Sequence, residues 1–200
     1  MVQTENRAPV CVYCASSPAA DAAYRDAAFR LGAVLADRGI PIIYGGGGMG
    51  SMGALADGAL ARGGRITGVL PRFMADLEWG HPGLTELRLV EDMRVRKHLM
   101  LAESAAAVAL PGGCGTLEEL LEAITLKRLG LYLKPIILVN TRNFFDPLVR
   151  LLEQSIAERF MDERHRAMWQ VVAEPEAVPD AIAAAPPWTD DVRRFAVRGR

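Results

Sequence analysis

The chain has 200 residues, the usual size of one domain, and 50% of them are hydrophobic, which is enough to fill a sizeable core. Its 23 basic and 24 acidic residues leave a net charge of -1, which excludes a global field that would favour nucleic acid or an anionic membrane. We see neither a signal peptide nor an apolar run approaching the ~20 residues of a membrane span. We therefore predict one cytoplasmic domain over residues 1–200, with its core at about 10–160.

Short apolar runs alternate with helical patterns along the chain. Strands are predicted at residues 10–13, 40–44, 65–70, 87–90, 105–110 and 135–139. Helices are predicted near residues 24–35, 52–60, 93–104, 116–129 and 145–159. Such alternation indicates parallel strands joined by right-handed helical crossovers. The fold class is therefore α/β, a Rossmann-like sandwich with a central parallel sheet flanked by helices.

The chain beyond Phe160 has a less regular pattern. Its Pro-rich piece at residues 185–188 and its arginine-bearing end at residues 191–200 predict a loosely packed or mobile tail. We assign this region no function.

Three cysteines, Cys11, Cys14 and Cys114, cannot all pair within one chain. The Cys11-x-x-Cys14 spacing suits a redox pair or a zinc site, but a redox pair would sit at a helix N-terminus and this segment looks like a buried strand. The three histidines show no ligand spacing. We therefore predict buried, reduced thiols and no metal site.

Two glycine-rich loops follow predicted strands, at the edge where parallel sheets bind ligands. In the first, residues 45–50, exposed N–H groups at a helix start make Gly45, Gly46 and Gly47 candidates for a phosphate. The dinucleotide fingerprint is not met cleanly. Because tight strand-to-helix turns also use glycine without binding anything, both interpretations of this loop stay open.

The second loop, LPGGCGTLEE at residues 110–119, has the more specific pattern. Gly112, Gly113 and Gly115 permit a closely packed backbone, and Thr116 can donate its hydroxyl and N–H to a phosphate. Thr116-x-x-Glu119 is also a capping box, in which the glutamate would only satisfy the helix start. A phosphate site and a simple helix cap therefore compete as explanations.

A third segment, MRVRKHLM at residues 93–100, places three basic residues on a predicted helix. Arg94 and Arg96 diverge on a helix, while Arg96 and Lys97 are about 100° apart. One basic group can therefore turn inward, although an isolated basic run usually forms a solvated face.

Together these segments resemble the Lonely Guy family, the cytokinin-activating phosphoribohydrolases. The family hallmark PGGxGTxxE is met from Pro111 to Glu119, and its M-x-x-R-K-x-x-M segment is met at residues 93–100. The resemblance also covers CVYCASS at residues 11–17 and KPIILVN at residues 134–140. It spans roughly Val10 to Phe160.

The resemblance implies hydrolysis of the N-glycosidic bond of adenine-type nucleoside 5′-monophosphates, which releases the base and ribose 5-phosphate. It implies Arg96 and Glu119 as the catalytic pair, with the carboxylate stabilising positive charge on the ribose, by analogy with sugar glycosidases. It also implies a homodimer whose site the partner subunit helps to complete, and no cofactor. The implied substrate contacts are Glu78, Arg96, Lys97, Gly113, Cys114, Gly115, Thr116, Leu117, Glu118, Glu119 and Thr125.

Two other functions are weighed against this one. Related folds carry a nucleotide or a molybdenum cofactor without cleaving it, and the presence of both Arg96 and Glu119 favours an enzyme. A lysine decarboxylase would need pyridoxal phosphate on a lysine, and Lys97, Lys127 and Lys134 stand in no context that suggests a Schiff base. Departures from the family pattern at Ser51, Arg94, Cys114, Leu126 and Arg128 leave base preference open, including the choice between AMP and a prenylated nucleotide.

Overall fold

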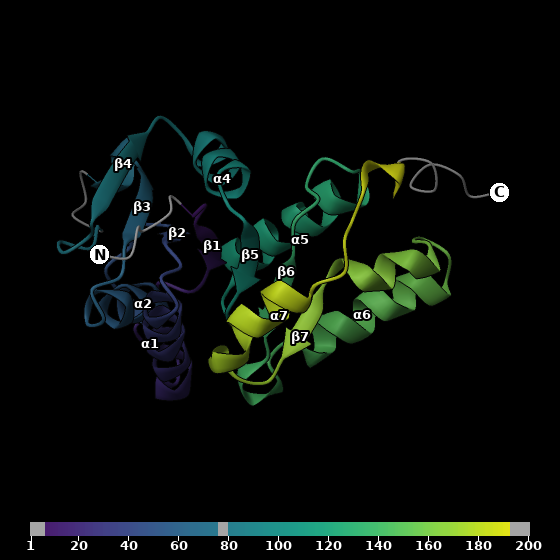
Figure 1. Cartoon of the computed structure of the whole chain (residues 1–200), viewed down its shortest axis with the longest axis horizontal. Coiled ribbons are helices and arrows are strands. Elements are labelled where there is room, and N and C mark those ends of the chain that lie inside the picture. Colours follow the sequence, from purple (N-terminus) through teal and green to yellow (C-terminus); the bar gives the residue numbers. More distant parts are fainter. Residues whose placement is uncertain (1–6, 76–79, 193–200) are drawn as a thin grey trace.

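The computed structural model describes residues 7–75 and 80–192, which form a seven-stranded sheet flanked by helices (Figure 1). The strands are β1 (Val10–Tyr13), β2 (Ile42–Tyr44), β3 (Ile66–Pro71), β4 (Glu86–Val90), β5 (Ala106–Ala109), β6 (Ile136–Val139) and β7 (Gln170–Val172). The α-helices are α1 (Ala22–Asp37), α2 (Gly50–Leu60), α3 (Arg72–Ala75), α4 (Met93–Ala102), α5 (Cys114–Arg128), α6 (Asp146–Ala157) and α7 (Val178–Ala184). Short 3-10 turns are η1 (Thr141–Asn143), η2 (Glu163–Met168), η3 (Pro175–Ala177) and η4 (Asp190–Val192).

All neighbouring strands are parallel, in the order β4-β3-β2-β1-β5-β6-β7. The chain winds from β1 toward β4 in one direction and from β5 toward β7 in the other. The order therefore reverses between β1 and β5, and loops that leave the carboxyl ends of these two strands diverge. The predicted Rossmann-like α/β fold is confirmed, and the reversal marks the place where such sheets bind ligands.

Side chains alternate across the sheet and build one apolar layer on each face. Val10 and Val12 of β1 pack with α1, α2 and α7, whereas Cys11 and Tyr13 of the same strand pack with α4, α5 and α6. Helices thus cover both faces, as crossovers of one hand require when the winding direction reverses.

Helices α1 and α2 lie against each other with almost no space between their backbones. A Cβ on Gly32 of α1 would lie 2.2 Å from the Leu55 carbonyl oxygen, and one on Gly58 of α2 would lie 2.0 Å from that of Phe29. Only glycine permits this approach. Gly39 follows α1 and adopts a left-handed φ of 63°, a conformation that ends many helices.

The segment after Phe160 is more ordered than its composition predicts. It supplies β7 to the sheet edge and α7 to one face, and the Trp188 indole Nε1 donates to the Lys127 carbonyl at 3.0 Å. The prediction of a loosely packed tail is therefore wrong for residues 185–188, because the partly buried indole packs against the core. Residues 193–200 lie outside the described part.

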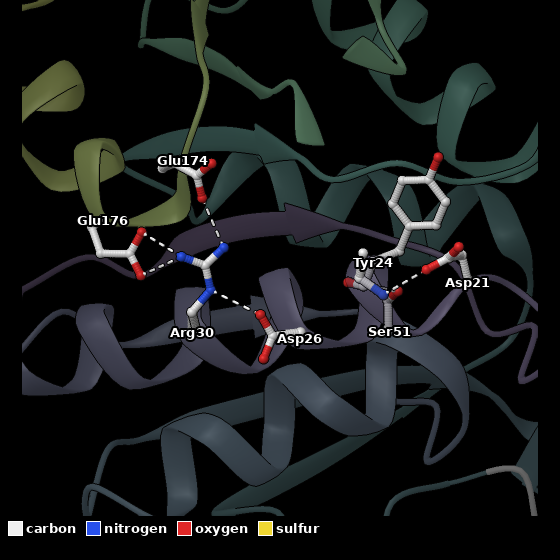
Figure 2. A network of polar contacts seen from close by, with 8 residues as sticks. Asp21, Tyr24, Asp26, Arg30, Ser51, Glu174 and Glu176 are labelled. Carbon is white, nitrogen blue, oxygen red and sulfur yellow. Dashed lines mark hydrogen bonds and ion pairs between the residues drawn. The ribbon is translucent and has the colours of Figure 1, made fainter. Parts of the chain in front are cut away.

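Ion pairs tie this segment to α1 (Figure 2). The Arg30 guanidinium contacts Glu174 at 2.8 Å, Glu176 at 3.0 Å and Asp26 at 3.1 Å. All four side chains are partly or largely solvent-exposed, so each pair contributes little to stability. Their role is to fix where the chain turns after β7.

Within residues 7–75 and 80–192, no helix is both long enough and apolar enough to cross a bilayer.

Candidate active site

A pocket of about 460 Å³ opens beside the point where the strand order reverses. Its walls come from the loops after β1, β2 and β5, from β3 and α3, and from the first turns of α2, α4 and α5. It is lined by Cys14, Ala15, Ser16, Ser17, Pro18, Gly45, Gly47, Gly48, Met49, Met52, Leu70, Met74, Met93, Arg96, Gly113, Gly115, Thr116, Glu118 and Glu119.

Arg96 is the basic residue that turns inward. The Asp92 side chain caps α4 by accepting from the Val95 N–H at 2.8 Å, and the resulting phase places Arg96 on the same face as the buried Met100. The Arg96 side chain is nearly enclosed, while Arg94 is exposed. A solvated face is therefore the wrong explanation for Arg96.

Glu119 reaches the pocket from the inward stripe of α5. Thr116, Glu119, Leu120, Ala123 and Lys127 recur at helical spacing and are all buried. The polar members of this stripe lie at both ends of an apolar segment. Residue spacing alone therefore brings a hydroxyl and a carboxylate to the pocket end of the helix.

The capping-box interpretation of Thr116 and Glu119 is wrong. The helix begins earlier than expected, with Gly113 as its N-cap and no side chain capping it. The first-turn N–H groups of residues 114–116 have no acceptor within the helix, and Gly113, Gly115 and Thr116 line the pocket. This end of α5 is therefore suited to an anion such as a phosphate.

Arg96 and Glu119 form a buried ion pair at the floor of the pocket. Arg96 Nη1 donates to Glu119 Oε1 at 2.9 Å, and Arg96 Nε donates to the Val69 carbonyl at 2.9 Å. Each residue is only 5% exposed. Burial raises the pKa of Glu119 above its usual value, while the charge of Arg96 opposes that rise. The carboxylate thus depends on this arginine for its negative charge.

Lys97 and Thr125 do not line the pocket. The Lys97 ammonium pairs with Glu118 and, at 3.0 Å, with Glu122, and Glu118 raises its pKa. The Thr125 hydroxyl donates to the Leu121 carbonyl at 2.7 Å on the exposed face of α5. Of the substrate contacts that the resemblance implies, Lys97 and Thr125 therefore lie outside the pocket of their own chain. Lys97 nevertheless forms an ion pair with the pocket-lining Glu118.

Other predicted residues divide into pocket walls and supports. Gly45 and Gly47 line the pocket, whereas Gly46 and Gly112 do not. Gly112 lies beneath Thr116, where a Cβ would come within 2.2 Å of the hydroxyl oxygen. Cys114 is exposed beside the pocket and Leu117 packs on the core. Glu78 lies outside the described residues.

The sequence interpretation missed much of the pocket wall. Ser16 and Ser17 were noted only within a matching segment, yet both line the pocket after β1. Their position after the first strand of a parallel sheet is a usable signal. The apolar wall of Met49, Met52, Met74 and Met93 gave no such signal, because these residues are brought together from three separate segments, the start of α2, α3 and the start of α4.

Cys11 and Cys14 are buried as predicted, and Cys14 lines the pocket, whereas Cys114 is exposed, so the prediction of a buried thiol is wrong for that residue. Burial raises the pKa of the Cys11 and Cys14 thiols far above its usual value, so both stay protonated at neutral pH. Among the described residues, no cluster of three or more His, Cys, Asp or Glu is arranged to hold a metal.

A pyridoxal phosphate site does not fit the lysines of this chain. None of the three lines the pocket. Lys127 donates to the Lys134 carbonyl at 2.6 Å, and Lys134 donates to the Ser104 carbonyl. An internal Schiff base would need a lysine Nζ facing the pocket.

This chain is similar in sequence to one described protein family and to several named proteins. The family described as possible lysine decarboxylase matches residues 52–182. Cytokinin riboside 5′-monophosphate phosphoribohydrolase LOG of rice is 39% identical over 168 residues, which cover 84% of this chain and 69% of the relative. The cytokinin riboside 5′-monophosphate phosphoribohydrolase of the bacterium Rhodococcoides fascians is 39% identical over 174 residues, 86% of this chain and 88% of the relative.

A solved structure gives a wider likeness in fold. The molybdenum cofactor carrier protein of Chlamydomonas reinhardtii matches with a TM-score of 0.69 over 89% of this chain and 97% of the other, at 20% identity. That likeness, at 20% identity, concerns the fold alone. With its PGGCGTLEE loop at the start of α5 and its buried arginine on α4, this chain belongs to the Lonely Guy family.

Proposed function

We propose that this chain is a phosphoribohydrolase that cleaves the N-glycosidic bond of adenine-type nucleoside 5′-monophosphates with water. The observation that carries the proposal is the buried Arg96–Glu119 pair, which stands in one pocket with the N-terminus of α5. A carboxylate and an anion site in one cavity match a substrate that holds a phosphate at one end of a ribose and develops positive charge at the other.

The 5′-phosphate is assigned to the first turn of α5. There the backbone N–H groups and the helix dipole favour an anion, and the Thr116 hydroxyl can add a hydrogen bond. The base is assigned to the apolar wall of methionines, because ligand pockets receive planar apolar groups on such surfaces. The ribose then lies between them, beside Glu119.

Glu119 supplies the charge for the chemical step. As the bond to the base breaks, the ribose gains oxocarbenium character, and a preorganised carboxylate in a water-poor site stabilises that charge more strongly than bulk water does. The same carboxylate orients the attacking water, by analogy with glycosidases. Arg96 lowers the pKa of this carboxylate and so opposes the rise that burial causes, which favours the ionised form.

The relatives support this activity and the carrier function has less support. The rice and Rhodococcoides proteins carry the name cytokinin riboside 5′-monophosphate phosphoribohydrolase, and both are about twice as similar in sequence as the molybdenum cofactor carrier. A carrier needs affinity but no buried carboxylate at the sugar. We propose AMP and its N6-prenylated forms as the substrate class, without a metal or other cofactor.

The enzyme is further proposed to be a cytoplasmic homodimer. Leu121, Thr125 and the C-cap residue Leu129 form one exposed stripe that runs along α5 away from its pocket-forming first turn. Thr125 points away from the pocket of its own chain, so its implied substrate contact requires the partner subunit. Light scattering after gel filtration tests the dimer, and a monomer at micromolar concentration contradicts it.

The test of the activity is incubation of the purified protein, with no added metal, with AMP, N6-isopentenyl-AMP and the matching nucleosides. Chromatography is expected to show free base from the monophosphates and none from the nucleosides. Equal rates on nucleotide and nucleoside would remove the phosphate site from the proposal. Tight binding of a nucleotide that is never cleaved would favour a carrier.

A further inference from the structure

Gly45 faces the Arg96 guanidinium at a distance that no other residue could tolerate. A Cβ built on Gly45 would lie 1.9 Å from Arg96 Nη2 and 3.1 Å from its Cζ. The next neighbour is Met52, whose Cε would be 3.0 Å away. The space that a side chain would occupy at position 45 is thus filled by the arginine itself.

The guanidinium has little freedom to withdraw from such a contact. Its Nε is bonded to the Val69 carbonyl on β3 and its Nη1 to Glu119 on α5, both at 2.9 Å and both buried. A displacement that keeps one bond bends or breaks the other. Leaving either buried group without its partner carries a large desolvation cost.

We propose that Gly45 is a positioning residue, whose missing side chain seats the Arg96 guanidinium so that it holds Glu119 in the pocket. This rests on the proposed function, and it gives Gly45 a role different from a backbone contact to phosphate. Glycine is required at this position because an arginine nitrogen, not a ligand, lies against its Cα.

The size of the effect follows from the overlap. Ordinary non-bonded heavy atoms approach to about 3.5–4.0 Å, so a methyl group at position 45 pushes Nη2 away by well over about 1 Å. A misplacement of about 1 Å at a catalytic group costs on the order of 100-fold in rate. Substrate affinity should change much less, because the anion site at the start of α5 is untouched.

The pH dependence separates positioning from general damage. The charged and titratable groups that act on Glu119 are Arg96 and Lys97 of α4, Glu118 of its own helix, and Cys11, Tyr13 and Cys14 from β1 and the residue after it. Of these, Arg96 is the strongest influence that lowers the Glu119 pKa. Moving the guanidinium away therefore raises that pKa further. As the pH is lowered, activity that needs the carboxylate then begins to fall at a higher pH value than in the wild type.

The first experiment compares Gly45→Ala with Gly80→Ala. A Cβ on Gly80 meets its nearest neighbour at an ordinary 3.6 Å, so this variant is the matched control. Gly45→Ala is expected to lower kcat by about 100-fold with KM changed by less than about threefold, and to move the acid limb of the kcat/KM profile to higher pH. A raised KM with an unmoved acid limb would overturn the proposal in favour of a ligand contact.

The contact with Met52 needs its own control. Met52 ends in a flexible thioether, so removal of its side chain relieves that contact entirely. Gly45→Ala should therefore lower kcat by the same factor in the Met52→Ala background as it does in the wild type. Recovery of activity in the double variant would mean that the methionine, not the arginine, is displaced.

A second experiment does not depend on activity. Lysine has no Nη2, so Gly45→Ala should lower the urea midpoint of the wild-type chain but hardly change that of Arg96→Lys. Should Gly45→Ala fail to fold, Gly45→Ala/Arg96→Lys is still expected to fold. Additive effects, or failure of both variants to fold, overturn the positioning role. If the stability effects of Gly45→Ala and Arg96→Lys are non-additive but the protein cleaves no nucleotide, the positioning role stands and only the proposed function is overturned.

Discussion

Glu119 is a buried carboxylate whose strongest pKa-lowering neighbour is the Arg96 guanidinium. Its own burial disfavours the charge, and the Arg96 guanidinium at 2.9 Å opposes that effect. Neither residue has an exposed alternative partner, since both side chains are almost completely enclosed. The pair behaves as one unit, so removal of either member leaves an uncompensated buried charge.

Glu119→Gln is expected to abolish most turnover while the fold survives. Glutamine keeps the shape of the side chain but carries no charge to stabilise a ribosyl cation, and each tenfold loss in kcat corresponds to about 1.4 kcal/mol. Glu122→Gln is the matched control, because Glu122 pairs with Lys97 outside the pocket. Steady-state kinetics with thermal melting checks this, and near wild-type activity of Glu119→Gln would return the pocket to a binding site.

The double variant Arg96→Ala/Glu119→Gln is expected to lose less than the product of the two single losses. Residues that act as a unit are non-additive, since the second change removes a function already lost. Kinetics on both single variants and the double variant, on one substrate, measures the coupling. Strictly multiplicative losses would mean that the two residues act independently.

Lys127 carries the second buried charge of α5, and it makes stability depend on pH. Burial lowers its pKa from 10.5 to about 8, so between those values the unfolded chain binds the proton and the folded chain does not. The free energy of unfolding of the wild type relative to Lys127→Met should therefore rise with pH from about 8 to about 10.5, by roughly 1 kcal/mol per unit. Urea unfolding across this range checks it, and a pH-independent difference contradicts it.

Sequence could single out Arg96 and Glu119 but not their geometry. The two residues stand in unusual contexts, a basic run and a glycine loop, and the structure brings them together in one buried pair. The capping box failed because Thr116-x-x-Glu119 also satisfies the inward stripe of a helix that begins at Cys114, and only packing decides between the two. Lys97 pairs with Glu118 and Glu122 while Arg96 turns into the pocket, because residues 100° apart on a helix face different surroundings.

At the scale of elements, α1 and α2 form the tightest contact of the fold. Gly32 and Gly58 allow each helix to place its backbone against a carbonyl oxygen of the other. This approach fixes the position of α2, whose first turn forms part of the pocket wall. The packing of two helices thus reaches the site without any side chain in between.

Gly58→Ala is expected to lower the free energy of unfolding by about 1–3 kcal/mol, because the overlap with backbone at 2.0 Å outweighs the gain in helix propensity. Gly115→Ala in α5 is the control, since a Cβ there has no heavy atom within 4 Å. Urea unfolding of both variants measures the difference. An equally stable Gly58→Ala protein would show that the two helices can slide apart freely.

Elements with a clear apolar pattern were predictable, and the others were not. Every predicted strand and helix is present with ends shifted by a few residues, because apolar periodicity is clear over a full turn or strand. The elements α3, β7 and α7 fall outside the predicted ranges, although the equally short β2 was predicted from the apolar run at residues 40–44 that contains it. β7 also exists only because β6 offers an edge to pair with, which no local sequence records.

At the scale of the whole molecule, residues 170–188 pack back onto the sheet and helices that come before them in the chain. β7 extends the sheet, Arg30 holds residues 174–176, and Trp188 crosses back to α5. Proline-rich composition predicted a loose tail, but prolines fix an extended path that carries the indole to its partner. Composition could not reveal that partner.

Trp188→Ala is expected to lower the free energy of unfolding by about 2–4 kcal/mol, since it removes a partly buried aromatic ring and one hydrogen bond to the Lys127 carbonyl, which still accepts from the Gly130 N–H. Trp188→Phe keeps most of the ring and loses the donor, so about 1 kcal/mol is expected. Urea unfolding separates the two parts. An unchanged stability in both variants would restore the loose-tail interpretation.

The methionine wall of the pocket gives the protein a sensitivity to oxidants. Met49 is 57% exposed, and with Met52, Met74 and Met93 it presents thioethers to whatever enters the cavity. Peroxide converts such a thioether into a polar, chiral sulfoxide, which methionine sulfoxide reductases reverse. Oxidation would therefore make the proposed base-binding wall hydrophilic while the proposed catalytic groups of Arg96 and Glu119 stay intact, so a stressed cell would lose recognition of the base before it lost those groups.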